Sequence, residues 1–364
     1  MSAPDNPSPE DLRGRLERFL LRNHGARAVD VRALRLLTGG ASRQTWAFDA
    51  TLDFPDGSTR ELALVLRSDL RSGTSFMSRD VEYRVLETVH RGGVATPRVH
   101  AMGDDSLDAP FFLMERVEGE TIARRILRDE RFAPARATMV RELGAILARI
   151  HQVPVAEPAL AMLPGAASET PSAAADECER YEQLYRTITP DPHPAFEVAF
   201  RWLRDHLPPA GADGQLPPAG ADGRPGSGGQ RTLVHGDFRL GNLIVGPEGI
   251  RAVLDWELAH IGDPLEDLGW LCVRSWRFGN DQLPAAGVGT REELWAAYEA
   301  AGGIAVDPER ALFWEVFGNL RWGIITIVQA KPYLDGHSRS VELASIGRRV
   351  AETEWELLAL LESV

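Results

Sequence analysis

Residues 233–270 are the most informative part of the chain and read LVHGDFRLGNLIVGPEGIRAVLDWELAHIGDPLEDLGW. They contain His235, then Asp237, then Asn242 five residues further on, and finally Asp255 after a short apolar run. Phosphoryl transfer needs these residue types, because one carboxylate must accept the proton of an attacking hydroxyl while an amide oxygen and a second carboxylate hold Mg²⁺. The pattern therefore favours a site for a magnesium-bound phosphate ester.

The order of these residues also predicts how they meet. A short loop can place Asp237 and Asn242 on facing sides of one site, and a hairpin over 243–254 can return Asp255 to the side of Asn242. His235 is expected to hydrogen-bond the loop backbone rather than to catalyse. The alternative is a polar turn that caps a helix, in which Asp237 and Asn242 only form the loop.

The residues before this stretch predict a small antiparallel sheet with one inserted helix, ending near Gly119. Apolar residues at helical spacing predict a helix over 9–24. The remaining expected elements are strands at 34–37, 44–53, 61–67, 97–102 and 111–117, and a helix at 77–90.

From residue 121 onward the pattern is mainly helical. Helices are expected at 134–152, 175–187, 195–206, from 265, and at 291–301, 308–327 and 339–361, with short strands at 232–234, 243–245 and 251–254. LPPAGADG occurs at 207–214 and again at 216–223, so residues 207–230 are interpreted as a flexible insert. The fold class is α+β, with an N-terminal lobe over 1–119 and a helical C-terminal lobe over 120–364.

Composition excludes several classes of function. The 364 residues carry a net charge of −13, which argues against a nucleic-acid-binding protein. The apolar runs are too short to predict a membrane span, and the polar N-terminus does not resemble a signal peptide. Two cysteines cannot form a disulfide framework, so a reducing, cytoplasmic location is expected.

The spacing H-x-D-x-x-x-x-N is that of the protein-kinase catalytic loop. Together, HGDFRLGN at 235–242 and LDWELAHIGDPLEDLGW at 254–270 resemble the aminoglycoside phosphotransferase family, which has a bilobal protein-kinase-like fold. The chain is most similar to the subgroup associated with acyl-CoA dehydrogenases. This resemblance implies an ATP- and Mg²⁺-dependent kinase acting on a small-molecule hydroxyl. A homodimer is compatible with it.

The resemblance also implies residue roles. Asp237 resembles the catalytic base, and Asn242 and Asp255 resemble the Mg²⁺ ligands. Asp263 and Asp267 resemble positions that brace the loop and cap the following helix. The acceptor is expected to be a metabolic alcohol, such as a hydroxyacyl compound, rather than an antibiotic.

The N-terminal lobe is expected to bind the nucleotide. Gly39, Gly40 and Ser42 lie between two predicted strands, where backbone N–H groups can cover phosphates. The next strand, ELALVLR, ends in Arg67, whereas the family has a lysine there that bonds the phosphates. Glu82 is the expected partner of Arg67. The chain has a single lysine, Lys331, so an arginine must supply this charge.

The segment FFLMERV at 111–117 resembles the hinge between the lobes. The resemblance implies that Met114 lines the adenine pocket, and that the carbonyl of Glu115 and the N–H of Val117 bond the adenine edge. The acceptor pocket is expected among the C-terminal helices, with these candidates: Trp270, Trp276, Phe278, Trp314, Phe317, Arg321 and Trp322.

Two other functions remain open from the sequence. The missing lysine allows a pseudokinase that binds nucleotide without catalysis. A metal-dependent phosphohydrolase could use His235, Asp237 and Asp255 as ligands, although such sites usually have more His and Asp ligands.

Overall fold

The structure is a computed structural model that describes residues 8–37, 43–69, 77–168, 170, 172–188, 191–208 and 231–362. The chain divides into two compact units: unit 1 comprises residues 1–119 and 251–258, and unit 2 comprises residues 120–250 and 259–364. The sequence assigns 251–258 to the C-terminal lobe. The structure places this segment in unit 1, where the Val253 N–H donates to the Ala95 carbonyl over 2.7 Å.

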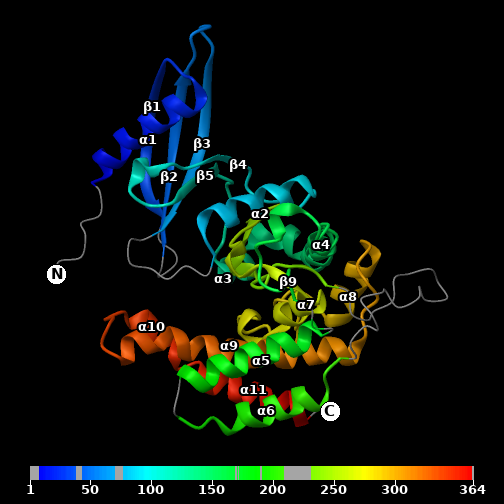
Figure 1. Ribbon diagram of the computed structural model, residues 1–364. Coiled ribbons are helices and arrows are strands. Elements are labelled where there is room, and N and C mark those ends of the chain that lie inside the picture. Colours follow the sequence, from blue (N-terminus) through cyan, green and yellow to red (C-terminus); the bar gives the residue numbers. More distant parts are fainter. Residues whose placement is uncertain are drawn as a thin grey trace. The chain divides into compact units, whose positions relative to one another are not determined.

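Unit 1 is built on a five-stranded antiparallel sheet with the order β1-β2-β3-β5-β4 (Figure 1). The strands are β1 (Ala28–Leu37), β2 (Arg43–Asp53), β3 (Thr59–Asp69), β4 (Val99–Met102) and β5 (Phe111–Glu115), and α2 (Arg79–Arg91) lies between β3 and β4 in the chain. Strands β2 and β3 pair along their whole lengths, from Arg43↔Asp69 to Asp53↔Thr59. The long β3 thus carries Arg67 close to its end.

Helix α1 (Pro9–His24) covers this sheet and packs against β1. The Ser8 side chain caps it by accepting from the Asp11 N–H over 3.1 Å, and Gly25 ends it with φ 64°. The buried face consists of the residues that the periodicity predicts: Leu12, Leu16, Phe19 and Leu20. The Phe19 ring meets Phe111 edge-on at 5.0 Å, which ties the helix to the sheet core.

Unit 2 is mainly helical. Its helices are α3 (Ala123–Arg128), α4 (Ala133–His151), α5 (Ala173–Ile188), α6 (Pro194–Asp205), α7 (Leu265–Cys272), α8 (Arg291–Ala300), α9 (Pro308–Leu334), α10 (Val341–Gly347) and α11 (Val350–Glu362). The single helix predicted over 339–361 is wrong, because the chain forms α10 and α11 instead. Gly347 ends α10, and a Cβ at Gly347 would lie 2.5 Å from the Ala330 Cβ on α9.

Helix α9 runs through the centre of unit 2 and contacts α5, α6, α7, α10 and α11 (Figure 1). It is the one helix among the described residues with the length and apolar composition to span a membrane, and 72% of that apolar window is buried inside the protein. Gly269 on α7 allows close packing, since a Cβ there would lie 2.4 Å from the Trp314 backbone. The apolar character of α9 therefore follows from its place in the core.

Two short two-stranded sheets frame the loop over 235–242. Strand β6 (Thr232–Val234) pairs antiparallel with β9 (His260–Gly262), and β7 (Leu243–Gly246) pairs with β8 (Gly249–Val253). The sequence does not predict β9, because three residues carry no readable alternation. The antiparallel sheet and the helical unit confirm the predicted α+β class.

Candidate functional site

Asp237 lies in the loop between β6 and β7, and both of its carboxylate oxygens are held. Asn242 Nδ2 donates to Asp237 Oδ2 over 2.6 Å and to the Asp237 backbone carbonyl over 2.9 Å. Arg239 Nε and Trp270 Nε1 each donate to Asp237 Oδ1 over 3.0 Å. The structure thus brings Asp237 and Asn242 together as the spacing predicts. The sequence does not predict the contributions of Arg239 and Trp270.

The backbone just before Asp237 is fixed by two buried side chains. Gly236 has φ 78°, a left-handed conformation that favours glycine. The Asp267 carboxylate accepts from the His235 N–H over 2.8 Å and from the Gly236 N–H over 2.9 Å. Arg321 Nη2 donates to the Gly236 carbonyl over 2.8 Å. The bracing role that the resemblance implies for Asp267 is matched by these two contacts.

Asp267 is fully buried on α7 and is held in its charged form by its partners. Burial alone would raise the pKa of Asp267, but the hydrogen bond from His151 and the backbone N–H of His235 lower it below the ordinary aspartate value. His151 Nε2 lies 3.2 Å from Asp267, and its Nδ1 lies 2.9 Å from the Tyr298 hydroxyl. The charge that fixes the loop is therefore itself anchored in the core.

His235 and Asp263 accept hydrogen bonds from backbone N–H groups of the loop and of the start of α7. The Asp237 N–H donates to His235 Nδ1 over 3.1 Å, and the His235 ring is fully buried, so this histidine bonds the loop backbone as expected. Asp263 Oδ1 accepts from the Leu265 N–H over 2.9 Å at the start of α7, and Asp263 Oδ2 accepts from Arg310 Nε over 2.9 Å. Asp263 thus caps α7, as the resemblance implies.

In unit 1, a single guanidinium nitrogen joins two carboxylates. Arg67 Nη2 lies 3.0 Å from Glu82 Oε1, as expected from the sequence, and 2.9 Å from Asp255 Oδ1. The second oxygen of Glu82 pairs with Arg79, and both of these side chains are only 1% exposed. Glu82 is therefore a buried carboxylate between two arginines.

Asp255 follows β8 in an unusual backbone conformation. Its φ is 65°, in the left-handed region that few residues other than glycine adopt and that aspartate tolerates better than most. Its side chain keeps 32% of its surface exposed while one oxygen binds Arg67. This turn directs the carboxylate back toward the end of β3, a contact that the sequence does not predict.

The other expected nucleotide contacts fall into two groups. Met114 is buried on β5 opposite Val65 of β3, Glu115 is the exposed last residue of that strand, and Val117 follows it. The Glu115 N–H donates to the Arg98 carbonyl over 2.8 Å. The adenine contacts of this segment stay predictions. The expected phosphate loop, Gly39, Gly40 and Ser42, lies outside the described residues.

A model of the phosphotransferase enzyme family, APH, matches residues 33–305, which is well over half of the chain. The chain belongs to this family. The family that the motifs at 235–242 and 254–270 predict is thereby confirmed.

A relative of this phosphotransferase supports the predicted subgroup as well. Acyl-CoA dehydrogenase family member 10 of Mus musculus is 29% identical over 318 residues, which are 80% of this chain and 27% of the mouse protein. The chain thus spans about a quarter of that relative's length. The predicted likeness to the subgroup associated with acyl-CoA dehydrogenases is confirmed.

Two solved structures show that the fold is that of the kinase-like phosphotransferases. A candidate aminoglycoside phosphotransferase from Ralstonia eutropha has a TM-score of 0.67 at 23% identity, covering 94% of this chain and 97% of that one. A thermostable mutant of aminoglycoside phosphotransferase APH(4)-Ia, in a ternary complex with AMP-PNP and hygromycin B, has a TM-score of 0.57 at 18% identity, covering 96% and 98%.

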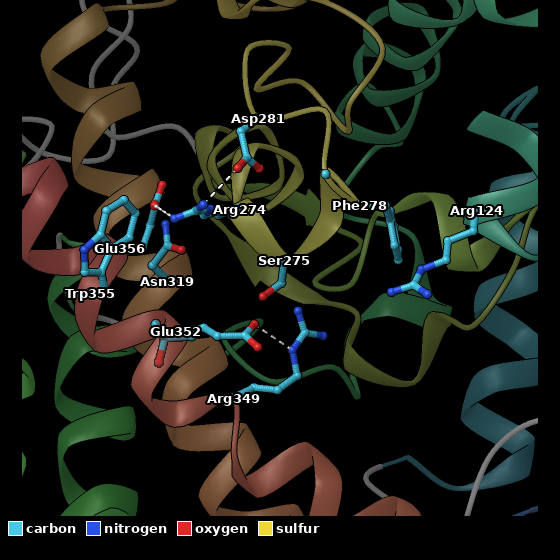
Figure 2. Close-up of a pocket in the computed structure, with 12 residues that line it drawn as sticks. Arg124, Arg274, Ser275, Phe278, Asp281, Asn319, Arg349, Glu352, Trp355 and Glu356 are labelled. Carbon is cyan, nitrogen blue, oxygen red and sulfur yellow. Dashed lines mark hydrogen bonds and ion pairs between the residues drawn. The ribbon is translucent and has the colours of Figure 1, made fainter. Parts of the chain in front are cut away.

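Unit 2 of this phosphotransferase contains a cavity of about 800 Å³ (Figure 2). Arg274 is joined to Asp281 over 2.8 Å and to Glu356 over 3.4 Å, and Arg349 is joined to Glu352 over 3.1 Å. The lining has equal numbers of basic and acidic side chains. It comes from α3, the segment after α7, α9, the turn before α11, and α11: Arg124, Arg274, Ser275, Phe278, Gly279, Asp281, Asn319, Arg349, Glu352, Thr353, Trp355 and Glu356.

Most of the aromatic residues expected around an acceptor do not line this cavity. Phe278 does, but Trp314 and Phe317 are fully buried in the core. Trp270 and Trp276 pack together with Trp322 in a three-tryptophan cluster. The ring centres of Trp270 and Trp276 are 5.4 Å apart, and those of Trp276 and Trp322 are 4.8 Å apart. Helical spacing alone cannot separate core aromatics from pocket aromatics.

The three-tryptophan cluster contacts both a residue of the cavity lining and a hydrogen-bond partner of Asp237. The Arg349 guanidinium, which lines the cavity, lies 5.8 Å from the Trp322 ring. The Arg239 guanidinium, which binds Asp237, lies 4.9 Å from the Trp276 ring. The cavity and the carboxylate thus share one aromatic support in unit 2.

Proposed function

We propose that this chain transfers the γ-phosphoryl group of Mg²⁺-bound ATP to a hydroxyl of a small molecule, with Asp237 as the base. Membership of the phosphotransferase family supports the reaction class. The observation that carries the finer proposal is the 2.6 Å contact between Asp237 and Asn242 in a loop that Asp267 and Arg321 hold rigid.

The residues present fit magnesium and a nucleotide. Asn242 and Asp255 offer the amide and carboxylate oxygens that Mg²⁺ prefers, and their convergence on one ion is part of the proposal. The Arg67 guanidinium suits phosphate oxygens as well as it suits carboxylates. When bound, MgATP supplies the phosphoryl group and a divalent cation that neutralises its charge. The solved APH(4)-Ia complex contains an ATP analogue, AMP-PNP, which supports this choice of donor.

The two oxygens of Asp237 have different partners. Oδ1 accepts from Arg239 and Trp270, whereas Oδ2 accepts from Asn242. Oδ2 therefore keeps more capacity to accept another hydrogen bond. In the proposed reaction the acceptor hydroxyl would donate to Oδ2, which would take its proton as the hydroxyl oxygen bonds the γ-phosphorus, while the bond from that phosphorus to the bridging oxygen breaks and ADP leaves. Catalysis then depends mostly on orientation and charge neutralisation.

The contacts of His235 weigh against the phosphohydrolase alternative. A metal ligand needs a ring nitrogen with a lone pair directed at the ion, but His235 Nδ1 accepts from the Asp237 N–H and the ring is buried. The Arg67–Glu82 contact weighs against the pseudokinase alternative, since an arginine here makes the ion pair expected of the usual lysine.

The cavity of unit 2 is the proposed acceptor site. Its lining has as many arginines as carboxylates, so it is not the acidic lining that would suit a polycationic aminoglycoside. The likeness to a protein named as an acyl-CoA dehydrogenase family member supports a metabolic alcohol, such as a hydroxyacyl compound.

The test combines nucleotide binding with a panel of acceptors. Calorimetry with MgATP measures binding, and ADP release is followed with aminoglycosides, neutral alcohols, hydroxycarboxylates and hydroxyacyl thioesters. We expect ADP release only with an acceptor, and phosphate on that acceptor by mass spectrometry. Asp237→Ala should abolish transfer while MgATP still binds, and Asp255→Ala should weaken MgATP binding.

Asp335→Ala, at the exposed end of α9, is the matched control and should behave like the wild type. Normal turnover in both Asp237→Ala and Asp255→Ala would refute the proposal. Phosphate release without an acceptor would favour the phosphohydrolase, and MgATP binding without any turnover would favour the pseudokinase.

A further inference from the structure

Arg321 on α9 is a buried cation with a partner on each of its three nitrogens. Its side chain is 1% exposed. Nη2 donates to the Gly236 carbonyl over 2.8 Å, Nη1 donates to Glu266 Oε1 over 2.6 Å, and Nε donates to the Tyr181 hydroxyl over 2.8 Å. Glu266 supplies the counter-charge, and the bonds to Tyr181 and Gly236 satisfy the other buried N–H groups. The bond to Gly236 has a second consequence. It holds the residue that immediately precedes Asp237.

The same guanidinium also supports a second partner of Asp237. It lies 4.7 Å from the centre of the Trp270 ring, and Trp270 Nε1 donates to Asp237 Oδ1 over 3.0 Å. Trp276 packs against Trp270 at 5.4 Å between ring centres. A buried ring held by these neighbours has a fixed N–H direction, so the Asp237 carboxylate is held in one orientation.

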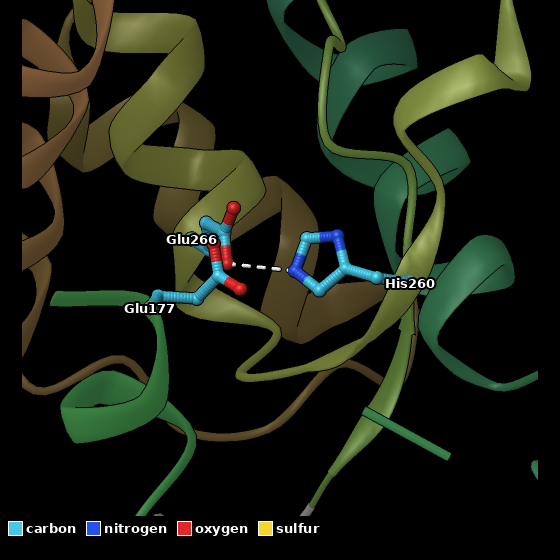
Figure 3. Close-up of side chains that lie close together, drawn as sticks. All are labelled: Glu177, His260 and Glu266. Carbon is cyan, nitrogen blue, oxygen red and sulfur yellow. Dashed lines mark hydrogen bonds and ion pairs between the residues drawn. The ribbon is translucent and has the colours of Figure 1, made fainter. Parts of the chain in front are cut away.

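Glu266, the ion-pair partner of Arg321, belongs to a buried cluster with Glu177 and His260 (Figure 3). Glu177, His260 and Glu266 place their ligating atoms within 4.8 Å of one another, and His260 Nε2 lies 3.0 Å from Glu266 Oε2. Each carboxylate already has its own guanidinium, because Arg180 pairs with Glu177 and Arg321 pairs with Glu266. A divalent cation would face both of these positive charges. The cluster therefore serves to fix Arg321 rather than to bind a metal.

We propose that Arg321 is a positioning residue for the Asp237 carboxylate, acting through the Gly236 carbonyl and through the Trp270 ring. The inference rests on the proposed function, in which Asp237 is the base. A base must keep its oxygen within about 0.5 Å of the productive position, and Arg321 holds both the backbone and the hydrogen-bond donor that set this position. In the described part of the chain, Arg321 makes its hydrogen bonds to Tyr181, Glu266 and Gly236 and none to Asp237 itself.

The first test is kinetic. Trp270→Phe keeps an aromatic ring beside Arg321 but removes the N–H, so we expect kcat to fall about tenfold while the KM for MgATP changes by less than about twofold. Arg321→Lys keeps the charge near Glu266 but cannot make three directed bonds, so a similar loss of kcat is expected. Arg180→Lys is the matched control, because Arg180 belongs to the same cluster and bonds Glu177 rather than the loop.

The second test does not depend on activity. In protein labelled with ¹⁵N-tryptophan, Trp270→Phe identifies the Trp270 indole signal. We expect that signal to shift in Asp237→Ala and its hydrogen exchange to accelerate about tenfold in Arg321→Lys, but not in Arg180→Lys. Because Arg321 is buried, thermal unfolding is measured first, and Tyr181→Phe, which removes only the oxygen that accepts from Nε, replaces Arg321→Lys if the latter does not fold.

These outcomes separate the two proposals. If the wild type transfers no phosphate to any acceptor, the proposed function fails, while the indole measurement still decides whether Arg321 orders Trp270. If the wild type is active and Asp237→Ala is not, yet Trp270→Phe and Arg321→Lys match the wild type in kcat, the positioning role is refuted. Unchanged indole exchange in Arg321→Lys refutes it as well.

Discussion

Arg67 donates to Asp255 across 2.9 Å, from near the end of β3 to the second residue after β8. The same nitrogen lies 3.0 Å from Glu82, so one guanidinium pairs with two carboxylates. In the proposed enzyme Asp255 is a magnesium ligand and Arg67 meets the phosphates. The cation that stands where the family has a lysine thus already contacts the proposed magnesium ligand as well as Glu82.

Arg67→Met should weaken MgATP binding more than Arg67→Lys does. The methionine removes the charge, whereas the lysine keeps a cation between Glu82 and Asp255 but loses the fork that matches phosphate. We expect the Kd to rise more than about tenfold for the methionine and less than about tenfold for the lysine, measured by calorimetry. Arg60→Met, on the same strand at an exposed position, is the control. Unaltered binding in Arg67→Met would contradict this.

Glu82→Gln should destabilise the protein strongly. The buried Glu82 carboxylate pairs with both Arg67 and Arg79, and an amide removes the negative charge that these two cations share, with Asp255 still paired to Arg67. We expect the free energy of unfolding to fall by about 3 kcal/mol in urea titrations. Glu87→Gln, on an exposed position of the same helix, should change it by less than about 0.5 kcal/mol. Equal effects of the two substitutions would show that the Glu82 ion pairs contribute little.

Much of the fold follows from local patterns in the sequence. The apolar spacing of 9–24 predicts both the limits of α1 and its buried face, because that pattern depends only on residues three and four apart. The same holds for Asp237 and Asn242, which one short loop brings within 2.6 Å. Local spacing is therefore sufficient for the part of the site that lies within one loop.

The missed contacts join residues far apart in the chain. Arg67 and Asp255 are 188 residues apart, and Trp270 lies 33 residues from Asp237. No periodicity reports which side chain of a buried helix donates to a loop. The predicted end of α9 at Ile327 is also wrong, because the helix continues to Leu334 with Pro332 inside it.

Neither cysteine should react in the native protein. Cys178 and Cys272 are both buried, and burial raises the pKa of both thiols, that of Cys178 to about 12. The thiolate is the reactive form, so a disulfide reagent such as DTNB at pH 8 should release no colour until urea unfolds the chain, when both thiols should react. Rapid reaction of one thiol without urea would show that its helix opens readily.

Asp267→Asn should destabilise the protein in a way that depends on pH. The native pKa of Asp267 is lowered, so its stabilisation is complete above the unfolded pKa of about 3.9 and is lost as the pH falls through the native value. At pH 7 the asparagine places an amide against the His235 and Gly236 N–H groups, and we expect the free energy of unfolding to fall by about 3 kcal/mol. In urea titrations from pH 7 to pH 3, the difference in free energy of unfolding between wild type and variant should therefore narrow below about pH 4. Asp335→Asn, at an exposed site, should show no such change. A gap that stays constant down to pH 3 would mean that the Asp267 charge does not stabilise the loop.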